Sequence, residues 1–294
     1  WGKKKLKKEK VLVEFVSSNP TGPLHIGHAR GAILGNIISN LLSNQGYEVT
    51  KEYYVNDAGR QINILALSIM LETFQNNINK EGLYQGDYIK DLAKKFMAAK
   101  LVNEVNNPVD KFSEDPDERI DQLISHYKKD APETWILIRD FSVNEMIKLI
   151  KNDLSRMEIL HDEWFYESSL GSIEKKDSSV AKALDEIIRS KNTFEKDGAI
   201  WFKGTKYGDD KDRVLLRANK EPTYYLTDVG YHKNKIDRNF DHYINIFGAD
   251  HHGYVARLTS AFNLIKKPKQ NIEHILYQLV NLYEDGRKKT MSTR

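Results

Sequence analysis

The sequence contains no cysteine. This absence excludes disulfide bonds, a thiolate nucleophile and cysteine-bound zinc. The sequence also lacks any apolar run near the roughly 18 to 20 residues that span a bilayer, and no signal-type apolar segment follows its basic beginning. We therefore expect no membrane partner, and the default compartment is the cytoplasm.

A strong charge bias is also missing, because 45 basic and 42 acidic residues leave a net charge of only +3. Contact with nucleic acid would then depend on local clusters. One cluster comprises Lys3, Lys4, Lys5, Lys7, Lys8 and Lys10, and the other Arg287, Lys288, Lys289 and Arg294. The lysines of the first cluster can equally belong to a solvated linker or tail. The length of 294 residues suits one large or two modest domains.

The first 75 residues alternate between strand and helix patterns. An apolar run at 11–16 predicts a strand buried on both faces, as in parallel sheets. Helical spacing at 28–45 ends at Gly46, a β-branched and aromatic strand pattern follows at 47–55, and a second helix is expected at about 58–75. Its core candidates are Ile62, Leu65, Ile69 and Phe74. This alternation predicts an α/β fold with a doubly wound parallel sheet.

The middle of the chain changes character. Residues 76–219 form charged, mostly helical stretches, which we interpret as an insertion containing two paired strands at 199–202 and 213–216. The parallel pattern then resumes with a strand at 243–247, a helix at 252–264, a strand near 275–280 and a tight turn at Asp285-Gly286. The predicted division is a first half of the sheet domain at 1–75, the insertion at 76–219 and a second half at 220–294.

Glycine, proline and histidine gather between the first strand and the first helix. The string is Asn19-Pro20-Thr21-Gly22-Pro23-Leu24-His25-Ile26-Gly27-His28. A helix N-terminus favours anions, and ligands of open α/β sheets bind beyond the carboxyl ends of the strands. Gly27 lets a nucleotide approach the backbone, while His25 and His28 offer donors to phosphates. Taken alone, one histidine could instead cap the helix and the other pack beside it.

The string resembles the His-Ile-Gly-His signature of class I aminoacyl-tRNA synthetases. The resemblance implies a Rossmann-like nucleotidyl transferase domain that performs adenylation, in which an amino-acid carboxylate attacks the α-phosphate of ATP and pyrophosphate leaves. Catalysis would rest on positioning and on stabilisation of charge. His25 and His28 would be catalytic, Pro20, Gly22 and Gly27 would also contact ATP, and Mg²⁺ would accompany the nucleotide.

Further blocks are similar to the arginyl-tRNA synthetases. They lie at 13–23 with 25–31, at 53–59, at 208–213 and at 247–257. A guanidinium pocket needs a carboxylate in bidentate geometry and flat neighbours. Tyr224 and Asp228, at i and i+4 near the start of a helix, match the family's pair that reads the substrate side chain. Without the resemblance, Tyr224 could be a core aromatic and Asp228 a solvated first-turn acid.

The resemblance implies two more groups of substrate contacts. Ser17 and Asn19 would lie near the main-chain groups of arginine, with Glu14 beside them. Gly248, Asp250 and His251 would face the nucleoside or the substrate. Adjacent histidines beside Asp250 could suggest zinc, but neighbouring residues on a helix diverge and no third residue has ligand spacing, so we predict no metal site.

Class I enzymes close over ATP with a loop of Lys-Met-Ser-Lys-Ser type. The corresponding segment here is Thr290-Met291-Ser292-Thr293-Arg294, with threonine at both usual lysine positions. Met291 and Ser292 are expected to contact ATP. Lys288, Lys289 and Arg294 are the nearest replacement cations, and we assign Lys289 and Arg294 to catalysis.

The implied partners are arginine, ATP and tRNA(Arg), and the expected state is a monomer. Family members normally add a helical anticodon-binding domain, and bacterial-type members an N-terminal tRNA-contacting domain. Neither is represented, so the sequence predicts a catalytic core. The open alternatives are another class I synthetase, a small nucleotidyl transferase and a catalytically inactive tRNA-binding core fragment.

Overall fold

The computed structural model describes residues 8–75, 78–99, 105 and 112–289. Contacts divide the chain into two compact units, which are described separately here. The first comprises Trp1–Ser17, Ile26–Val55 and Ile159–Val280. The second comprises Ser18–His25, Asn56–Glu158 and Asn281–Arg294.

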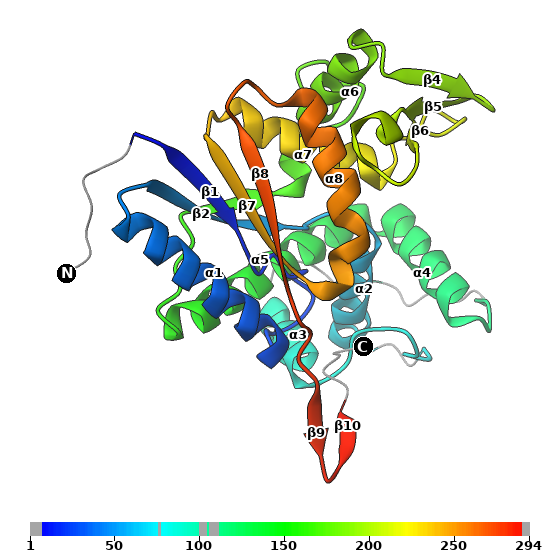
Figure 1. The fold of residues 1–294 in the computed structure, drawn as a ribbon. Helices are drawn as coiled ribbons and strands as arrows, with labels where there is room; N and C mark the ends of the chain where they lie inside the picture. The colour runs from blue at the N-terminus through cyan, green and yellow to red at the C-terminus, as the bar shows by residue number, and fades with distance from the viewer. Residues whose placement is uncertain (1–7, 76–77, 100–104, 106–111, 290–294) are drawn as a thin grey trace. The chain divides into compact units, whose positions relative to one another are not determined.

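The first unit is built on a five-stranded parallel sheet with the order β3-β2-β1-β7-β8 (Figure 1). Its strands are β1 (Lys10–Glu14), β2 (Glu48–Val55), β3 (Glu163–Tyr166), β7 (His242–Gly248) and β8 (Asn271–Tyr277). Val11, Leu12 and Val13 of the central strand are at most 1% exposed. This burial confirms the predicted doubly wound α/β sheet, because a strand covered on both faces reads as a continuous apolar run.

Helices cover both faces of this sheet. On one face lies α1 (Ile26–Asn44), and on the other lie α7 (Tyr224–Asp237) and α8 (His252–Ile265) (Figure 1). Side chains alternate between the two faces along β1 and the residue after it, since Phe15 contacts Gly35 of α1 while Leu12 packs with Leu226 and Phe262 on the other face. The helix α6 (Ser179–Arg189) packs on α7.

The predicted first helix is confirmed, and its buried face consists of small residues. Gly31, Ala32, Gly35 and Ser39 of α1 are buried, whereas its isoleucines at 26, 33 and 37 are about half exposed. A small-residue face lets the helix backbone approach the strands closely. Gly46 ends the helix as predicted, with φ of 92° and an N–H that donates to the carbonyl of Ser43.

The predicted insertion contains two strands, β3 and β4, that the sequence analysis did not predict. The strand β3, which the sequence analysis missed, pairs with β2 at the edge of the main sheet. The predicted strands β5 (Ala199–Phe202) and β6 (Arg213–Leu216) do pair, and β4 (Thr193–Lys196) extends them to a three-stranded antiparallel sheet. The predicted last strand begins four residues early, at Asn271, because polar residues such as Glu273 and His274 obscure the pattern there.

The second unit is mainly helical. Its helices are α2 (Arg60–Thr73), α3 (Asp87–Ala98), α4 (Pro116–Asp130) and α5 (Pro132–Arg156). Of the predicted core residues of α2, Ile62, Leu65 and Ile69 are fully buried and Phe74 is half-buried. The unit also holds a hairpin of β9 (Leu282–Glu284) and β10 (Arg287–Lys289), whose Asp285-Gly286 turn has positive φ at both residues, as a tight hairpin requires.

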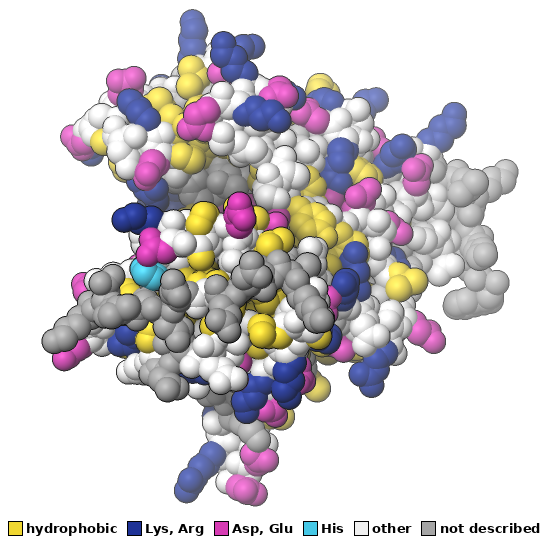
Figure 2. Space-filling view, turned by 180° about the vertical axis from the view of Figure 1, so that it is seen from behind, with side chains coloured by type: hydrophobic (Ala, Val, Ile, Leu, Met, Phe, Trp, Pro, Cys, Tyr) yellow, Lys and Arg dark blue, Asp and Glu magenta, His cyan; other side chains and the backbone are white. Residues whose placement is uncertain are grey.

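The described surface mixes charges of both signs. Basic and acidic side chains are interspersed over the face shown in Figure 2. Such a mixture accords with the net charge of +3. Within the described ranges, no helix combines the length and apolar character needed to cross a membrane. The division at 76 and 220 stays a prediction.

Candidate substrate site at the carboxyl ends of the strands

The carboxyl ends of β1 and β7 carry most of the predicted contacts of the first unit. Parallel strands end at a common edge, which is where open α/β sheets bind ligands. Glu14 is the last residue of β1, and Gly248 is the last residue of β7. Tyr224 and Asp228 lie one turn apart at the start of α7, as predicted. The capping Thr223 fixes this start, because its hydroxyl accepts from the N–H of Leu226 and donates to the carbonyl of Val214 at 2.7 Å.

The turn after β1 is strained. Val16 and Ser17 have φ of 69° and 41°, and a left-handed conformation is rare for a β-branched residue. The Ser17 hydroxyl stabilises the turn by donating to Glu14 Oε1 at 3.1 Å and accepting from the N–H of Tyr54 at 3.0 Å. Strain held in this way is typical of functional sites. The turn contains the predicted contact Ser17 and sets the direction of the chain toward the predicted contact Asn19.

The predicted phosphate contacts belong to different units, and each group is described within its own unit. Gly27 and His28 lie in the first turn of α1, which contains no acidic residue, and both are half-buried. A helix start without acids favours an anion. His25 and the predicted contacts Asn19, Pro20 and Gly22 belong to the other unit, where the Tyr88 hydroxyl donates to the carbonyl of Thr21 at 3.0 Å. Pro20 is buried, His25 and Gly22 are half-buried, and Asn19 is exposed.

Asp228 carries a carboxylate oxygen that is shielded from solvent. Within the described part of the chain, Oδ2 of Asp228 accepts no hydrogen bond, and Nη2 of Arg257 lies 3.9 Å away. Burial raises the pKa of Asp228 to about 7, the charge of Arg257 opposes this, and the charges of Glu167 and Glu14 add to it. The side chain of Asp228 is 32% exposed as a whole, but a carboxylate oxygen that is shielded from water and accepts no hydrogen bond is costly. The site therefore suits a ligand that brings a cation and donors.

Tyr224 is 72% exposed, so it is not a core aromatic. It lies one helical turn before Asp228 on the same helix face. An exposed aromatic ring beside a shielded carboxylate offers a flat surface on which a planar cation can stack. The structure thus brings together the two residues that the sequence analysis paired, and it excludes the alternative in which Asp228 is fully solvated.

Glu167 is a neighbour of Asp228 that the sequence analysis missed. It follows β3 directly, and the hydroxyl of Tyr54 donates to its Oε2 at 2.7 Å. Its negative charge contributes, after burial, to the raised pKa of Asp228. Acidic residues at a strand's carboxyl end were the available signal, but β3 itself was not recognised. Two carboxylates, rather than one, thus favour a cation here.

The end of β7 folds tightly on itself. A Cβ atom at Gly248 would collide with the carboxylate of Asp250, so a larger residue here would displace that exposed side chain. The ring of His251 stacks on Phe247 with centroids 5.4 Å apart, and its Nε2 lies 3.8 Å from Asp250 Oδ2. Asp250 and His251 are both exposed, as a ligand-facing pair requires. Among the described residues, no group of three histidine, aspartate or glutamate side chains has metal-binding geometry.

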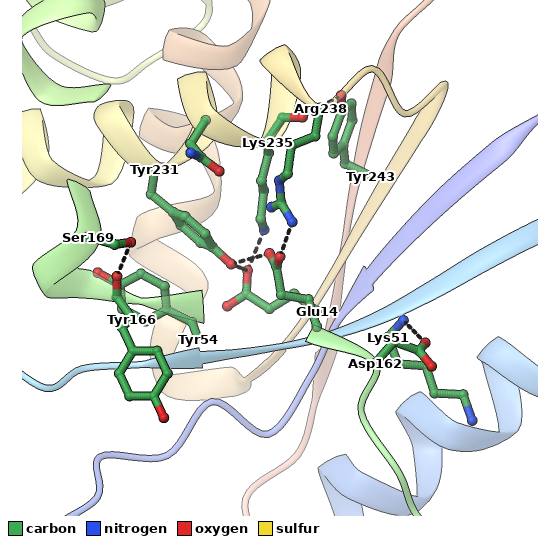
Figure 3. A network of polar contacts seen from close by, with 12 residues as sticks. Glu14, Lys51, Tyr54, Asp162, Tyr166, Ser169, Tyr231, Lys235, Arg238 and Tyr243 are labelled. Carbon is green, nitrogen blue, oxygen red and sulfur yellow. Dashed lines mark hydrogen bonds and ion pairs between the residues drawn. The ribbon is translucent and has the colours of Figure 1, made fainter. Parts of the chain in front are cut away.

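A buried polar network underlies the site (Figure 3). Glu14 accepts from the amino group of Lys235 and, at 3.1 Å, from the hydroxyl of Tyr231. The same hydroxyl lies closer to Glu52, at 2.6 Å, so its one proton is shared between the two carboxylates, and Arg238 also pairs with Glu52. Glu14 therefore does not present an uncompensated charge, since its partners already come from α7.

The predicted ATP-closing loop lies mostly outside the described residues. Met291, Ser292 and Arg294 fall there, and Lys289 is described only as the last residue of β10. The neighbouring Lys288 is an exposed residue of the same strand. These assignments therefore stay predictions.

Comparisons with known proteins agree with this geometry. Residues 1–294 match the model of the class I (R) tRNA synthetase catalytic domain. Arginine–tRNA ligases of Vesicomyosocius okutanii and Azoarcus sp. BH72 are 41% and 39% identical, over 97% and 100% of this chain and 51% and 53% of their own lengths. This chain thus spans about half the length of these curated relatives.

Solved structures show the same fold. A structure described as an arginyl-tRNA synthetase from Campylobacter jejuni superposes with a TM-score of 0.78 at 36% identity, over 99% of this chain and 59% of that one. Thermus thermophilus arginyl-tRNA synthetase gives a TM-score of 0.69 at 20% identity, over 95% and 50%, which supports the fold alone. The family match over residues 1–294, together with the five-stranded parallel sheet, shows that the chain belongs to the catalytic domains of the class I arginyl-tRNA synthetases.

Proposed function

We propose that this chain activates arginine with ATP and transfers it to tRNA(Arg). The observation that carries the proposal is Asp228, a shielded carboxylate whose Oδ2 accepts no hydrogen bond from any described residue. A guanidinium supplies a planar cation with paired donors. Glu167 adds a second negative charge, and Tyr224 adds a flat surface. Arginine fits this combination better than lysine, because an ammonium group cannot pair bidentately.

The remaining roles follow from position on the fold. Ser17 and Asn19 would hold the main-chain groups of arginine, and Glu14 would act mainly through Ser17 because Lys235 already compensates its charge. ATP would lie at the start of α1, contacting Pro20, Gly22, His25, Gly27 and His28. Gly248, Asp250 and His251 would face the nucleoside and the amino acid. Met291, Ser292, Lys289 and Arg294 would close over the phosphates, and Mg²⁺ would bind with ATP.

The proposed reaction needs no covalent intermediate with the protein. The arginine carboxylate would attack the α-phosphate and the bond to pyrophosphate would break. A terminal ribose hydroxyl of tRNA would then attack the arginyl carbonyl of the adenylate, so that the arginyl group passes to tRNA and AMP leaves. His28 would stabilise the charge that develops on the transferring phosphate. We place the protein in the cytoplasm as a monomer, with tRNA(Arg) as its nucleic-acid partner.

Amino-acid-dependent exchange of pyrophosphate into ATP tests this function. The assay is run for each amino acid, with and without tRNA(Arg), since members of the family are expected to require the tRNA for activation. We expect exchange with arginine only. Exchange with a different amino acid would contradict the specificity. Arginine binding without exchange in the presence of tRNA would identify the chain as an inactive tRNA-binding core.

A further inference from the structure

A row of polar residues crosses the buried face of the main sheet beneath α7. In the parallel register Glu14 pairs with Glu52 on one side and with Asn245 on the other, and Asn245 pairs with His274. Register partners in a parallel sheet point to the same face. Glu14, Glu52 and Asn245 are at most 5% exposed. Polar side chains in such a position need partners from the covering helix.

The helix α7 supplies those partners in matched order (Figure 3). Lys235, which is fully buried, pairs with Glu14, and Arg238, one turn later, pairs with Glu52. The Tyr231 hydroxyl lies within hydrogen-bond distance of both carboxylates and donates its one proton to either of them, and its ring lies 4.3 Å from the Lys235 amino group. Two cations therefore oppose two acids along the row. A shift of α7 by one turn would break both ion pairs, so the row fixes the position of the helix on the sheet.

Lys235 begins a chain of hydrogen bonds that all run in one direction. Its amino group donates to Asn245 Oδ1 at 2.9 Å, and Asn245 Nδ2 lies 3.4 Å from His232 Nε2. His232 Nδ1 lies 2.8 Å from the carbonyl oxygen of Asp228. Burial lowers the pKa of His232 to about 3, so the ring is neutral, donates through Nδ1 and accepts through Nε2. The chain ends on the backbone of the residue that carries the shielded carboxylate.

A second path leads from Lys235 to the strained turn. Lys235 holds Glu14, Glu14 Oε1 accepts from the Ser17 hydroxyl, and that hydroxyl also accepts from the N–H of Tyr54. A positive φ is costly at Val16 and Ser17, and these contacts stabilise it. Lys235 is thus connected both to the Val16–Ser17 turn and to the backbone of Asp228, although its own side chain is fully buried.

We propose that Lys235 is a positioning residue for arginine, which sets the Val16–Ser17 turn through Glu14 and the Asp228 backbone through Asn245 and His232. This inference rests on the proposed function. It assigns arginine selectivity partly to a lysine that touches no substrate. Its removal should weaken arginine binding while ATP binding, at the start of α1, stays nearly unchanged.

Calorimetric titration of the 294-residue chain with arginine and with ATP tests the proposal. Lys235→Met should weaken arginine binding at least about tenfold, the usual effect of losing a hydrogen bond to a charged group, and change ATP binding by less than about twofold. Lys235→Arg, which keeps the positive charge and the donors, should recover part of the loss. Lys233→Met is the matched control, because Lys233 is an ion-paired lysine of the same helix that faces Glu186 and Asp237 instead. It should leave both affinities unchanged.

Thermal unfolding distinguishes a positioning role from a general loss of structure. If Lys235→Met does not fold, Asn245→Leu takes its place, because it breaks the path to His232 but keeps the pair with Glu14, and it should weaken arginine binding about three- to tenfold. Equal losses for arginine and ATP, or unchanged arginine binding in a folded Lys235→Met or Asn245→Leu variant, would overturn the proposal. Failure of the unaltered chain to bind arginine would instead remove the proposed function, and this inference with it.

Discussion

Oδ2 of Asp228 lies 3.9 Å from Nη2 of Arg257, close enough for attraction but too far for a hydrogen bond. Arg257 is held elsewhere, because its guanidinium stacks on the ring of Tyr254 at 3.3 Å from the centroid. Arg257 therefore leaves Oδ2 of Asp228 without a hydrogen bond. The charge of Arg257 thus lowers the free-energy cost of shielding the Asp228 carboxylate from water, while Oδ2 stays available to a cation of the substrate.

Asp228→Asn should weaken arginine binding without lowering the stability of the folded chain. We expect arginine affinity to fall at least about a hundredfold, since the bidentate ion pair is lost, while ATP affinity stays within about twofold. The folded chain should be at least as stable as the unaltered one, because a poorly paired buried charge is removed. Calorimetry with each ligand and a thermal melt measure these effects. Asp237→Asn, at the exposed end of the same helix, serves as the control and should not alter either affinity.

Arginine binding should depend on pH near neutrality. Burial raises the pKa of Asp228 to about 7, so the carboxyl group is partly protonated at pH 6 and mostly ionised at pH 8. A carboxylate binds guanidinium better than a carboxylic acid does, so affinity should rise between these values and a proton should be released on binding. Titrations in buffers with different ionisation enthalpies count that proton. The release should vanish in Asp228→Asn, and its persistence there would assign the proton to another group.

The same pKa has a consequence for stability without ligand. Because the pKa of Asp228 is raised above its ordinary value of 3.8, the folded state binds this proton more tightly than the unfolded state does. The contribution of Asp228 to the free energy of unfolding is therefore most favourable below pH 4 and is lost as the pH rises toward 7.

Glu167→Gln removes one charge that raises the pKa of Asp228, so it should shift the midpoint of the arginine-affinity profile to lower pH. An unchanged midpoint would show that Glu167 does not act on Asp228.

The main sheet and the pair Tyr224 and Asp228 could be predicted because their signals are local. The run at 11–16 is apolar throughout, Gly46 stops the helix, and a spacing of four residues places the pair on one helix face. The edge strand β3 was missed because it has only four residues, none of them fully buried. An edge strand with one polar end gives little periodic signal.

The polar network could not be predicted because its partners are distant in sequence. Lys235 and Glu14 are 221 residues apart, and Lys235 occurs in a charged segment where a lysine normally faces solvent. Its burial depends on the strand order and register, which place Glu14 beside Asn245. The same holds for the influence of Glu167 on the pKa of Asp228, which depends on the pairing of β3 with β2. Tertiary pairing, rather than local pattern, decides these positions.

His28→Ala tests the phosphate site. We expect exchange of pyrophosphate into ATP to fall about a hundredfold or more, which corresponds to loss of a well-placed donor to the transferring phosphate. Arginine affinity and thermal stability should change little, because His28 lies at the start of α1 and is only half-buried. His126→Ala is the control, since His126 pairs with Asp130 on a helix of the other unit. Near-normal exchange by His28→Ala in the presence of tRNA would remove the catalytic assignment.

Gly35→Ala should destabilise the sheet unit through one contact. A Cβ atom at Gly35 would collide with the ring of Phe15, which is fully buried between β1 and α1. Either the helix moves away from the sheet or the ring leaves its position, at a cost of about 1 to 3 kcal/mol. Gly253→Ala is the matched comparison, because no atom lies within 4 Å of a Cβ added there in α8. Alanine should be neutral or stabilising by up to about 1 kcal/mol at that helical position. Denaturant titration of both variants measures the difference, and equal stabilities would show that α1 does not pack against Phe15 as closely as described.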